Sequence, residues 1–231
     1  MGARISVVVI ALNEEERVSG TVRSAREGGP AVEVLLVDGG SGDGTRRAAE
    51  GAGARVVPSP PGRGIQLDHG ARHASGDWLV FLHADTRLEA GWSAELGRQP
   101  EGVAGGAFRF AIDSPRPCFR LIEAGVALRC RVFRLPFGDQ GIFARRAAYA
   151  AAGGFPPFPL MEDVAFVRRL AREGRLAFPR ARAFTSARRW ERAGVVATTL
   201  RNWWLLGLYA AGRPPGRLAR MYETRPSFPS G

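Results

Sequence analysis

The first hundred residues alternate between short apolar runs and segments whose apolar positions have helical spacing. The runs 5–12, 32–38, 54–59 and 77–85 predict strands, and 5–12 is a nearly continuous β-branched run, as expected of a strand buried on both faces of a parallel sheet. Between them, residues 13–26, 45–52 and 65–74 predict helices. This regular alternation predicts an open α/β sheet with mostly parallel strands.

The pattern is less regular after residue 100. It predicts a strand over 105–112, an arginine-studded helix over 118–133, a short strand over 142–145 and helices over 162–173 and 195–211. Loops are expected at 138–141 and 153–159, and a frayed end after the last helix. Neither an internal repeat nor a long linker divides the sequence, so we expect one domain over 1–231.

Polar residues follow three of the four predicted N-terminal strands. Asn13 and Glu14 come after the first, Asp38 ends the second, and His83 and Asp85 end the fourth. In an open parallel sheet, ligands bind beyond the carboxyl ends of the strands, so these side chains predict one binding crevice. Taken singly, Asn13 and Asp85 could be helix or turn caps, and Asp38 could brace its own glycine turn.

The glycine-rich segment 38–44 fits the cofactor turn of adenosylmethionine-dependent methyltransferases, so a methyltransferase is one alternative for the function. Such a site needs an acidic residue at the end of the following strand to hold the ribose. That strand ends in Val56-Val57-Pro58-Ser59-Pro60, without a carboxylate. A nucleotide-binding P-loop is excluded because it needs a lysine, and the sequence has none.

The charge distribution is uneven. All 33 basic residues are arginine; residues 1–100 have a balance of −2 and residues 101–231 a balance of +13. The arginines are scattered over many elements rather than interleaved with aromatic residues, which argues against a nucleic-acid binder. Cys118 and Cys130 lack the spacing of a zinc site. The N-terminal run is not a signal peptide and no stretch could span a bilayer, so we expect a cytoplasmic protein.

As a set, five segments resemble the family 2 inverting glycosyltransferases of the GT-A fold, most of all the small bacterial members. They are SVVVIALNEE, VLLVDGGSGDGT, GRGIQLDHGARHASGDWLVFLHADT, GDQGIFARR and GGFPPFPLMEDVAFVRRL. The resemblance implies transfer of a sugar from a nucleoside diphosphate donor, UDP-linked on family frequency. It implies a nucleotide-sugar half over 1–100, an acceptor half over 101–190 and a C-terminal tail over 191–231.

The resemblance also implies the donor site. Its expected residues are Ala11, Asn13, Glu14, Asp38, Gly39, Arg63, Arg72, Ala84 and Asp85. The first three would line the nucleoside pocket, Asp38 would contact the base, and the two arginines would face the base or the diphosphate. Asp85 would bind Mn²⁺ or Mg²⁺, with His83 either a second ligand or a packed residue.

Many family members supply a further, late histidine to the metal, and here that region reads Arg188-Arg189. Either Asp85 holds the cation with substrate phosphates and water, or these arginines share the neutralisation of charge. A degenerate protein that binds without catalysis is a further alternative.

On the acceptor side, the resemblance implies that Asp163 of the Glu162-Asp163 pair is the catalytic base. The two acids could instead stabilise a helix N-terminus. Burial against Phe155, Phe158 or Leu160 would raise the pKa of Asp163 and make it a stronger base. Gly154 would allow close approach of the acceptor, and Asp139 and Gln140 would bind sugar hydroxyls or serve as turn residues. The acceptor residues are thus Asp139, Gln140, Gly154, Glu162, Arg188 and Arg189.

The aromatic segment 195–209 permits two interpretations. In the favoured one, the helix packs on the catalytic domain and its tryptophans are core residues. In the other, it lies at the inner face of a membrane, where nearby arginines meet anionic head groups. A lipid-linked or anionic acceptor would then be natural.

Overall fold

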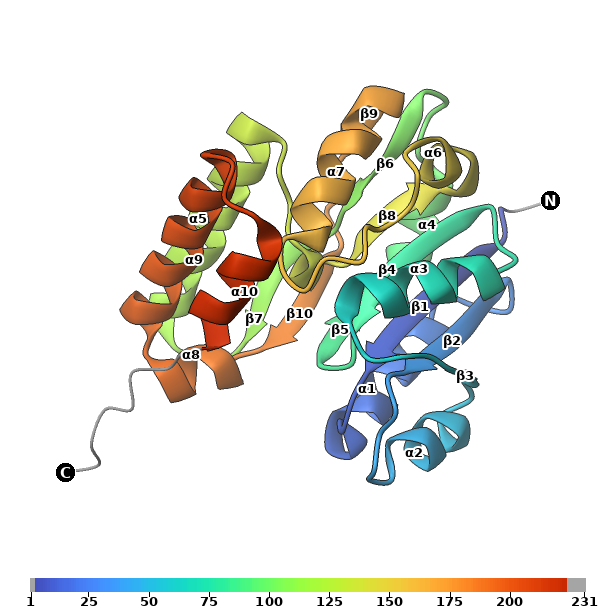
Figure 1. Cartoon of the computed structure of the whole chain (residues 1–231). Helices are drawn as coiled ribbons and strands as arrows, with labels where there is room; N and C mark the ends of the chain where they lie inside the picture. Colours follow the sequence, from blue (N-terminus) through green and yellow to red (C-terminus); the bar gives the residue numbers. More distant parts are fainter. Residues whose placement is uncertain (1–2, 224–231) are drawn as a thin grey trace.

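The computed structural model describes residues 3–223 and contains two β-sheets surrounded by helices (Figure 1). In spatial order, the large sheet consists of β3 (Arg55–Pro58), β2 (Val32–Asp38), β1 (Ile5–Ala11), β4 (Trp78–His83), β8 (Ile142–Arg145), β6 (Val103–Ala107) and β9 (Arg175–Ala177). The small sheet consists of β5 (Thr86–Leu88), β10 (Arg182–Ser186) and β7 (Arg109–Asp113).

The helices connect these strands and cover them (Figure 1). They are α1 (Glu15–Arg26), α2 (Thr45–Gly51), α3 (Arg63–His73), α4 (Trp92–Gly97), α5 (Pro117–Phe133), α6 (Arg146–Ala151), α7 (Glu162–Glu173), α8 (Arg188–Ala193), α9 (Val195–Ala210) and α10 (Pro215–Glu223), with a short 3-10 helix, η1, over Gly138–Gln140.

The central strand β1 determines where the site forms. It pairs in parallel with β2 and with β4, and β2 pairs in parallel with β3. Along β1, Val8 contributes to the core on one face of the sheet and Val7 to the core on the other, because successive side chains alternate. Both faces are buried, which explains the nearly continuous apolar run. The carboxyl ends of β1, β2 and β4 therefore lie at one edge, as predicted.

Two separate cores hold the helices against this sheet. The first includes Leu67 of α3 and Phe166 of α7, and the second includes Val18 and Val22 of α1. A third, smaller cluster around Trp190 joins α5 and α8 to the small sheet. The sequence-predicted α/β fold is thus confirmed, with helices on both faces of a sheet that becomes mixed at β8.

The single strand predicted over 105–112 is wrong, since two strands of different sheets occupy this segment. Phe108 separates them: it is fully buried, and its N–H donates to the carbonyl of Gln140 in η1. β6 runs close to β9, because a Cβ on Gly106 would meet the Ala177 carbonyl oxygen at 1.8 Å. The chain then turns into β7 and pairs with β10.

Several short elements also differ from the predictions. The strand predicted over 77–85 ends at His83, so Ala84 and Asp85 form a turn before β5. The loop predicted over 138–141 contains η1. The predictions omitted α4, α6, α8, α10, β5, β9 and β10. By contrast, β2, β8 and α7 have the predicted bounds.

The aromatic segment forms α9, which packs against α8 and α10 (Figure 1). Leu205 belongs to the core, but Trp203 and Trp204 are 47% and 52% exposed. The interpretation that these tryptophans are core residues is therefore wrong, because about half of each side chain is exposed. No helix within residues 3–223 has both the length and the apolarity to cross a bilayer.

Candidate active site

A cavity of about 640 Å³, which we call the large cavity, opens at the carboxyl ends of β1 and β4. Its walls come from seven places in the chain: the ends of these two strands, the start of α3, η1, the loop before α7, the segment from β10 through α8, and α10. The predicted site residues that line it are Ala11, Glu14, Arg63, His83, Ala84, Asp85, Asp139, Arg188 and Arg189. Segments from both halves of the sequence therefore form one site.

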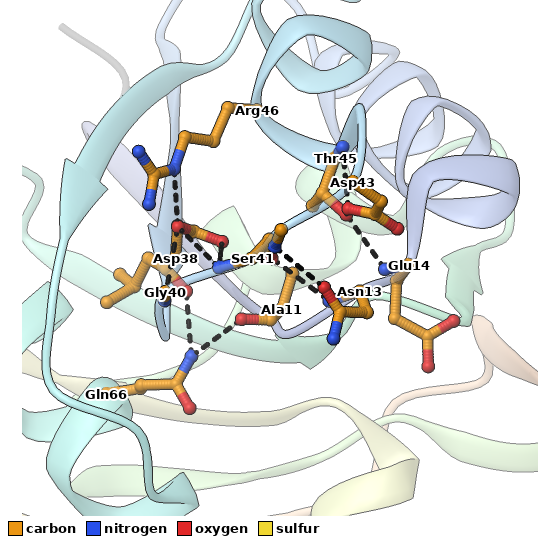
Figure 2. A network of polar contacts seen from close by, with 12 residues as sticks. Ala11, Asn13, Glu14, Asp38, Gly40, Ser41, Asp43, Thr45, Arg46 and Gln66 are labelled. Atoms are coloured by element: carbon orange, nitrogen blue, oxygen red, sulfur yellow. Dashed lines mark hydrogen bonds and ion pairs between the residues drawn. The ribbon is translucent and has the colours of Figure 1, made fainter.

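Asn13 and Asp38 shape the glycine loop beside this cavity, as Figure 2 shows. The Asp38 carboxylate accepts hydrogen bonds from the Gly40 and Ser41 N–H groups and pairs with Arg46 Nε at 2.6 Å. The Asn13 side-chain oxygen accepts from the Gly42 N–H at 2.9 Å, and the Asn13 backbone is left-handed, with a φ of 56°. This pattern matches the bracing of a glycine turn.

The electrostatics of Asp38 agree with this placement. Its burial alone would raise the pKa, but hydrogen bonds from Ser41 and Arg46 outweigh that effect and lower it. The carboxylate therefore stays ionised and holds the turn. The sequence reasoning missed Arg46, for which the only signal is a basic residue in the first turn of the helix after Asp38.

Gln66 connects this loop to the strands. Its amide nitrogen donates to the carbonyl oxygens of Ala11 and Val37, both at 2.9 Å (Figure 2). A Cβ on Gly39 would meet the Gln66 side chain at 3.0 Å, so Gly39 leaves room for it. Asn13, Asp38 and Gly39 thus lie next to the large cavity rather than in its lining. Their predicted contacts with a nucleoside stay predictions.

The two arginines predicted from α3 lie far apart. Arg63 begins the helix and lines the large cavity. Gly64 brings this end close to the loop before α7, since a Cβ there would meet the Pro156 carbonyl oxygen at 2.0 Å. Arg72 lies nine residues further along, about 13 Å at the helical rise, where it is exposed and pairs with Asp68. Arg72 lines none of the cavities described.

His83 and Asp85 reach the cavity from the end of β4. Burial, together with Arg63 and Arg189, lowers the pKa of His83 to about 3, so its imidazole is neutral near pH 7. Burial and the nearby Glu14 raise the pKa of Asp85, and Arg189 and Arg188 oppose this. A neutral imidazole and a carboxylate are both competent metal ligands.

The described side chains do not supply a complete set of ligands for a metal ion at this site. Within residues 3–223 there is no group of three or more His, Cys, Asp or Glu side chains that could hold an ion. A cation bound at Asp85 would take most of its ligands from a bound substrate and water, which suits a hard ion that keeps several non-protein oxygens. The residues present fit Mg²⁺ or Mn²⁺ in this limited sense.

The arginines that stand where the family's late histidine is expected both line the large cavity. Arg188 pairs with Glu14 at 2.9 Å and so connects the start of α8 to the start of α1. Figure 2 shows the Glu14 side chain pointing away from the glycine loop. Arg63 and Arg189 also line the cavity, so three arginines face it together with the carboxyl groups of Glu14, Asp85 and Asp139.

A second cavity of about 80 Å³, the small cavity, adjoins the first and contains the Glu162-Asp163 pair. The Asp163 carboxylate accepts hydrogen bonds at 2.7 Å from the N–H groups of Gly138 and Val164, which fix its orientation. Of the three apolar residues predicted around it, Leu160 lines this cavity, whereas Phe155 packs into the core against Phe81 and Phe166.

Glu162 is the buried member of this pair, with 3% of its surface exposed. Its Oε2 atom has no hydrogen-bond partner. Burial and the neighbouring Asp163 raise its pKa to about 7, and Arg63 opposes this shift. Both acids lie in the first turn of α7, so the predicted helix-terminus role and a place in the site coexist.

Three predicted acceptor residues differ in where they lie. Asp139 lines the large and the small cavity, and burial raises its pKa while Arg129 opposes this. The adjacent Gln140 is buried, and its side-chain oxygen accepts from Arg129 and from the Phe137 N–H, so it braces η1 as a turn residue. Gly154 lines neither cavity; its φ is 63°, and its lack of a Cβ leaves space for the Tyr149–Asp68 hydrogen bond.

Residues of the C-terminal helices α8, α9 and α10 complete the lining and were missed by the sequence reasoning. Trp190 and Tyr222 line the large cavity, and Asn202 lines the small one. Their positions depend on the packing of α8, α9 and α10, which no local motif specifies.

Comparisons with known proteins agree with this architecture. Residues 6–99 match the family model described as "Glycosyl transferase family 2". Glucosyl-3-phosphoglycerate synthase of Mycolicibacterium smegmatis is 37% identical over 95 residues, which are 36% of this chain and 31% of that protein. Glycosyltransferase AglJ of Haloferax volcanii is 35% identical over 142 residues, 59% of this chain and 46% of the relative. The chain spans less than half the length of these relatives.

Solved structures give the same answer for the fold. Glucosyl-3-phosphoglycerate synthase of Mycobacterium tuberculosis, in complex with UDP, Mn²⁺ and glucosyl-3-phosphoglycerate, has a TM-score of 0.57 at 26% identity and covers 77% of this chain and 69% of that one. The Pyrobaculum calidifontis mannosyltransferase PcManGT, in complex with GDP-Man and Mn²⁺, has a TM-score of 0.61 at 21% identity, covering 78% and 55%. These matches leave the methyltransferase alternative without support. Residues 6–99 are thus similar to glycosyltransferase family 2, and the chain has the GT-A fold of these solved glycosyltransferases.

Proposed function

We propose that the protein transfers a sugar from a nucleoside diphosphate donor, most simply a UDP-sugar, to an acceptor hydroxyl with inversion of configuration. One observation carries this proposal: a cavity at the ends of β1 and β4, with three arginines in its lining, adjoins a smaller one that contains an oriented carboxylate, Asp163. The first arrangement suits a diphosphate and the second suits a general base. The relatives bound to UDP or GDP-Man support the same donor class.

On the donor side, Arg63, Arg188 and Arg189 would stabilise the negative charge of the diphosphate. Asp85, with His83 beside it, would hold Mg²⁺ or Mn²⁺. When bound, the cation would neutralise charge on the leaving group. The arginines supply part of the same stabilisation, which fits the small number of metal ligands among the described residues.

On the acceptor side, Asp163 would accept the proton of the attacking hydroxyl. The acceptor oxygen would bond to the anomeric carbon from the face opposite the diphosphate, and the bond from that carbon to the diphosphate would break. The N–H groups of Gly138 and Val164 keep the carboxylate in place. Asp139 lines both cavities and would bind a sugar hydroxyl between donor and acceptor.

The acceptor itself we propose to be lipid-linked or anionic, with the protein in the cytoplasm and in peripheral contact with the inner face of a membrane. The arginine excess of residues 101–231 and the half-exposed tryptophans of α9 support this.

The test is a calorimetric titration of the protein with UDP, GDP, ADP and S-adenosylmethionine, each with and without Mn²⁺. The proposal expects one nucleoside diphosphate to bind, more tightly with Mn²⁺, and S-adenosylmethionine not to bind. Release of that diphosphate from its sugar conjugates then measures catalysis. Binding of S-adenosylmethionine alone would refute the proposal, and binding without any turnover on an acceptor library would favour the degenerate alternative.

A further inference from the structure

An apolar groove of about 420 Å³ runs between α5 and α9, which lie next to each other (Figure 1). Leu121 and Ile122 contribute from α5, and Leu200 and Trp203 from α9. Leu121, Leu200 and Trp203 are 78%, 63% and 47% exposed. Such exposure of large apolar side chains in a concave surface is typical of a binding site.

The groove is continuous with the acceptor side of the site. Asp139 lines the groove as well as the large and small cavities. Phe137 and Asn202 line both the groove and the small cavity, and Trp190 lines both the groove and the large cavity. A molecule in the groove would therefore end beside the carboxylates of the active site.

The charged residues of the groove lie at one of its ends. Arg129 and Asp139 are its only charged lining residues within the described part of the chain. Both belong to the end at η1, because Arg129 donates to the side chain of Gln140, the neighbour of Asp139. The rest of the lining is almost entirely apolar. A polar end at the active site and an apolar remainder complement an amphiphilic molecule with its polar group toward Asp139.

We infer that this groove binds the single hydrocarbon chain of an amphiphilic acceptor, whose hydroxyl then lies at the junction with the small cavity. The inference rests on the proposed function and narrows the acceptor to this chemical class. The volume lies within the range of small-molecule sites. The groove is concave and leads into the active site, so it suits one inserted hydrocarbon chain better than the flat surface of a second copy of the protein.

The experiment uses the full chain and n-alkyl β-maltosides with chains of eight, ten and twelve carbons, below their critical micelle concentrations. Cys118 is exposed and lines the groove, whereas Cys130 is buried. Binding is therefore measured as protection of Cys118 from alkylation by a maleimide, quantified by mass spectrometry. We expect protection, with an affinity that rises by up to about fourfold per methylene group when the chain is fully buried.

Two matched variants locate the binding. Leu200→Glu changes a groove residue that is 63% exposed, and Leu128→Glu changes a residue of α5 that is equally exposed but lies outside the groove. Because both side chains face solvent, both variants should fold. Leu200→Glu is expected to weaken binding at least about tenfold, since a charge would enter the apolar lining, and Leu128→Glu should match the wild type.

The inference would be overturned by an affinity independent of chain length, by equal losses in both variants, or by Cys118 protection with phosphatidylcholine vesicles but not with monomeric maltosides. UDP binding is measured on the same samples, so that a failure of the groove inference can be distinguished from a failure of the proposed function. If UDP binds and the maltosides do not, only the inference about the groove fails. If the maltosides bind and no nucleotide does, the donor assignment fails, and with it the identification of the occupant as an acceptor.

Discussion

At the residue scale, the structure separates the two acids that begin α7. Asp163 has both carboxylate oxygens engaged by backbone N–H groups, while Glu162 is nearly inaccessible and has an unpartnered oxygen. Adjacent residues on one helical turn thus have different chemistry. The side chain with the fixed orientation is suited to accept a proton from a bound hydroxyl, and the buried one can change its protonation state near neutral pH.

Replacing Asp163 with asparagine keeps the shape of the side chain and removes the proton acceptor. We expect turnover to fall by roughly two to four orders of magnitude, with little change in donor affinity. Steady-state kinetics and calorimetric titration of the nucleotide measure the two effects. Asp113→Asn, on the exposed end of β7, is the control and should behave as the wild type. Transfer by Asp163→Asn at a near wild-type rate would leave Asp163 as a helix-terminus residue only.

Glu162 gives the stability of the protein a specific pH dependence. Its pKa is raised from 4.5 to about 7, so between these values the folded state keeps a proton that the unfolded state releases. Stability is then fully present below about pH 4.5 and decreases as the pH rises through 7, by about 3 kcal/mol at most for this shift. Urea denaturation of Glu162→Gln should show a smaller decrease over this range than the wild type. Parallel pH profiles for the two proteins would contradict the assignment.

Asp85 is the residue on which a metal dependence must rest, because few other ligands surround it. Asp85→Ala should therefore abolish the Mn²⁺-dependent part of UDP binding, measured by calorimetry with and without the ion. The metal-independent part, which Arg63, Arg188 and Arg189 would provide, should persist. Asp113→Ala again serves as a control. Undiminished metal dependence in Asp85→Ala would exclude Asp85 as the ligand.

At the element scale, the close approach of α3 to the loop before α7 joins the proposed donor and acceptor sides. A Cβ at position 64 would lie 2.0 Å from the Pro156 carbonyl oxygen, a backbone atom. Gly64→Ala should therefore displace the start of α3, cost about 1–3 kcal/mol of stability and weaken nucleotide binding through Arg63. Gly51→Ala adds the same methyl group to α2, where nothing lies within 4 Å, and should be neutral or slightly stabilising. Urea denaturation and UDP titration of both variants test this.

The elements also show where sequence reasoning succeeds. Strand β2 and helix α7 could be predicted because local hydrophobic periodicity specifies them. The break at Phe108 could not, because it depends on a hydrogen bond to η1, more than thirty residues later in the chain. In the same way, Arg188 reaches Glu14 only through the packing of α8. Sequence motifs identified the strand ends and the acidic pair. The residues that the C-terminal helices add to the cavity lining could be found only from the tertiary structure.

At the scale of the whole molecule, the two halves differ in both charge and surface. Residues 1–100 are close to neutral, with a balance of −2, whereas residues 101–231 have a balance of +13. The second half also presents exposed apolar side chains on α5 and α9, among them Leu121, Phe133, Val196 and Trp204. Positive charge and exposed apolar residues in the same half are the combination that favours an anionic bilayer surface.

This asymmetry predicts salt-sensitive binding to membranes that contain anionic lipids. In sedimentation with vesicles of phosphatidylcholine and phosphatidylglycerol, most of the protein should pellet at low salt and less of it as rising ionic strength screens the arginines. Vesicles of pure phosphatidylcholine should pellet little of the protein, because the exposed apolar residues alone have a small contact area with the bilayer. Trp204→Ala, at a side chain that is 52% exposed and outside the groove lining, should weaken binding at every salt concentration without changing its slope. Protein that stays in the supernatant under all these conditions would make a water-soluble acceptor the better hypothesis.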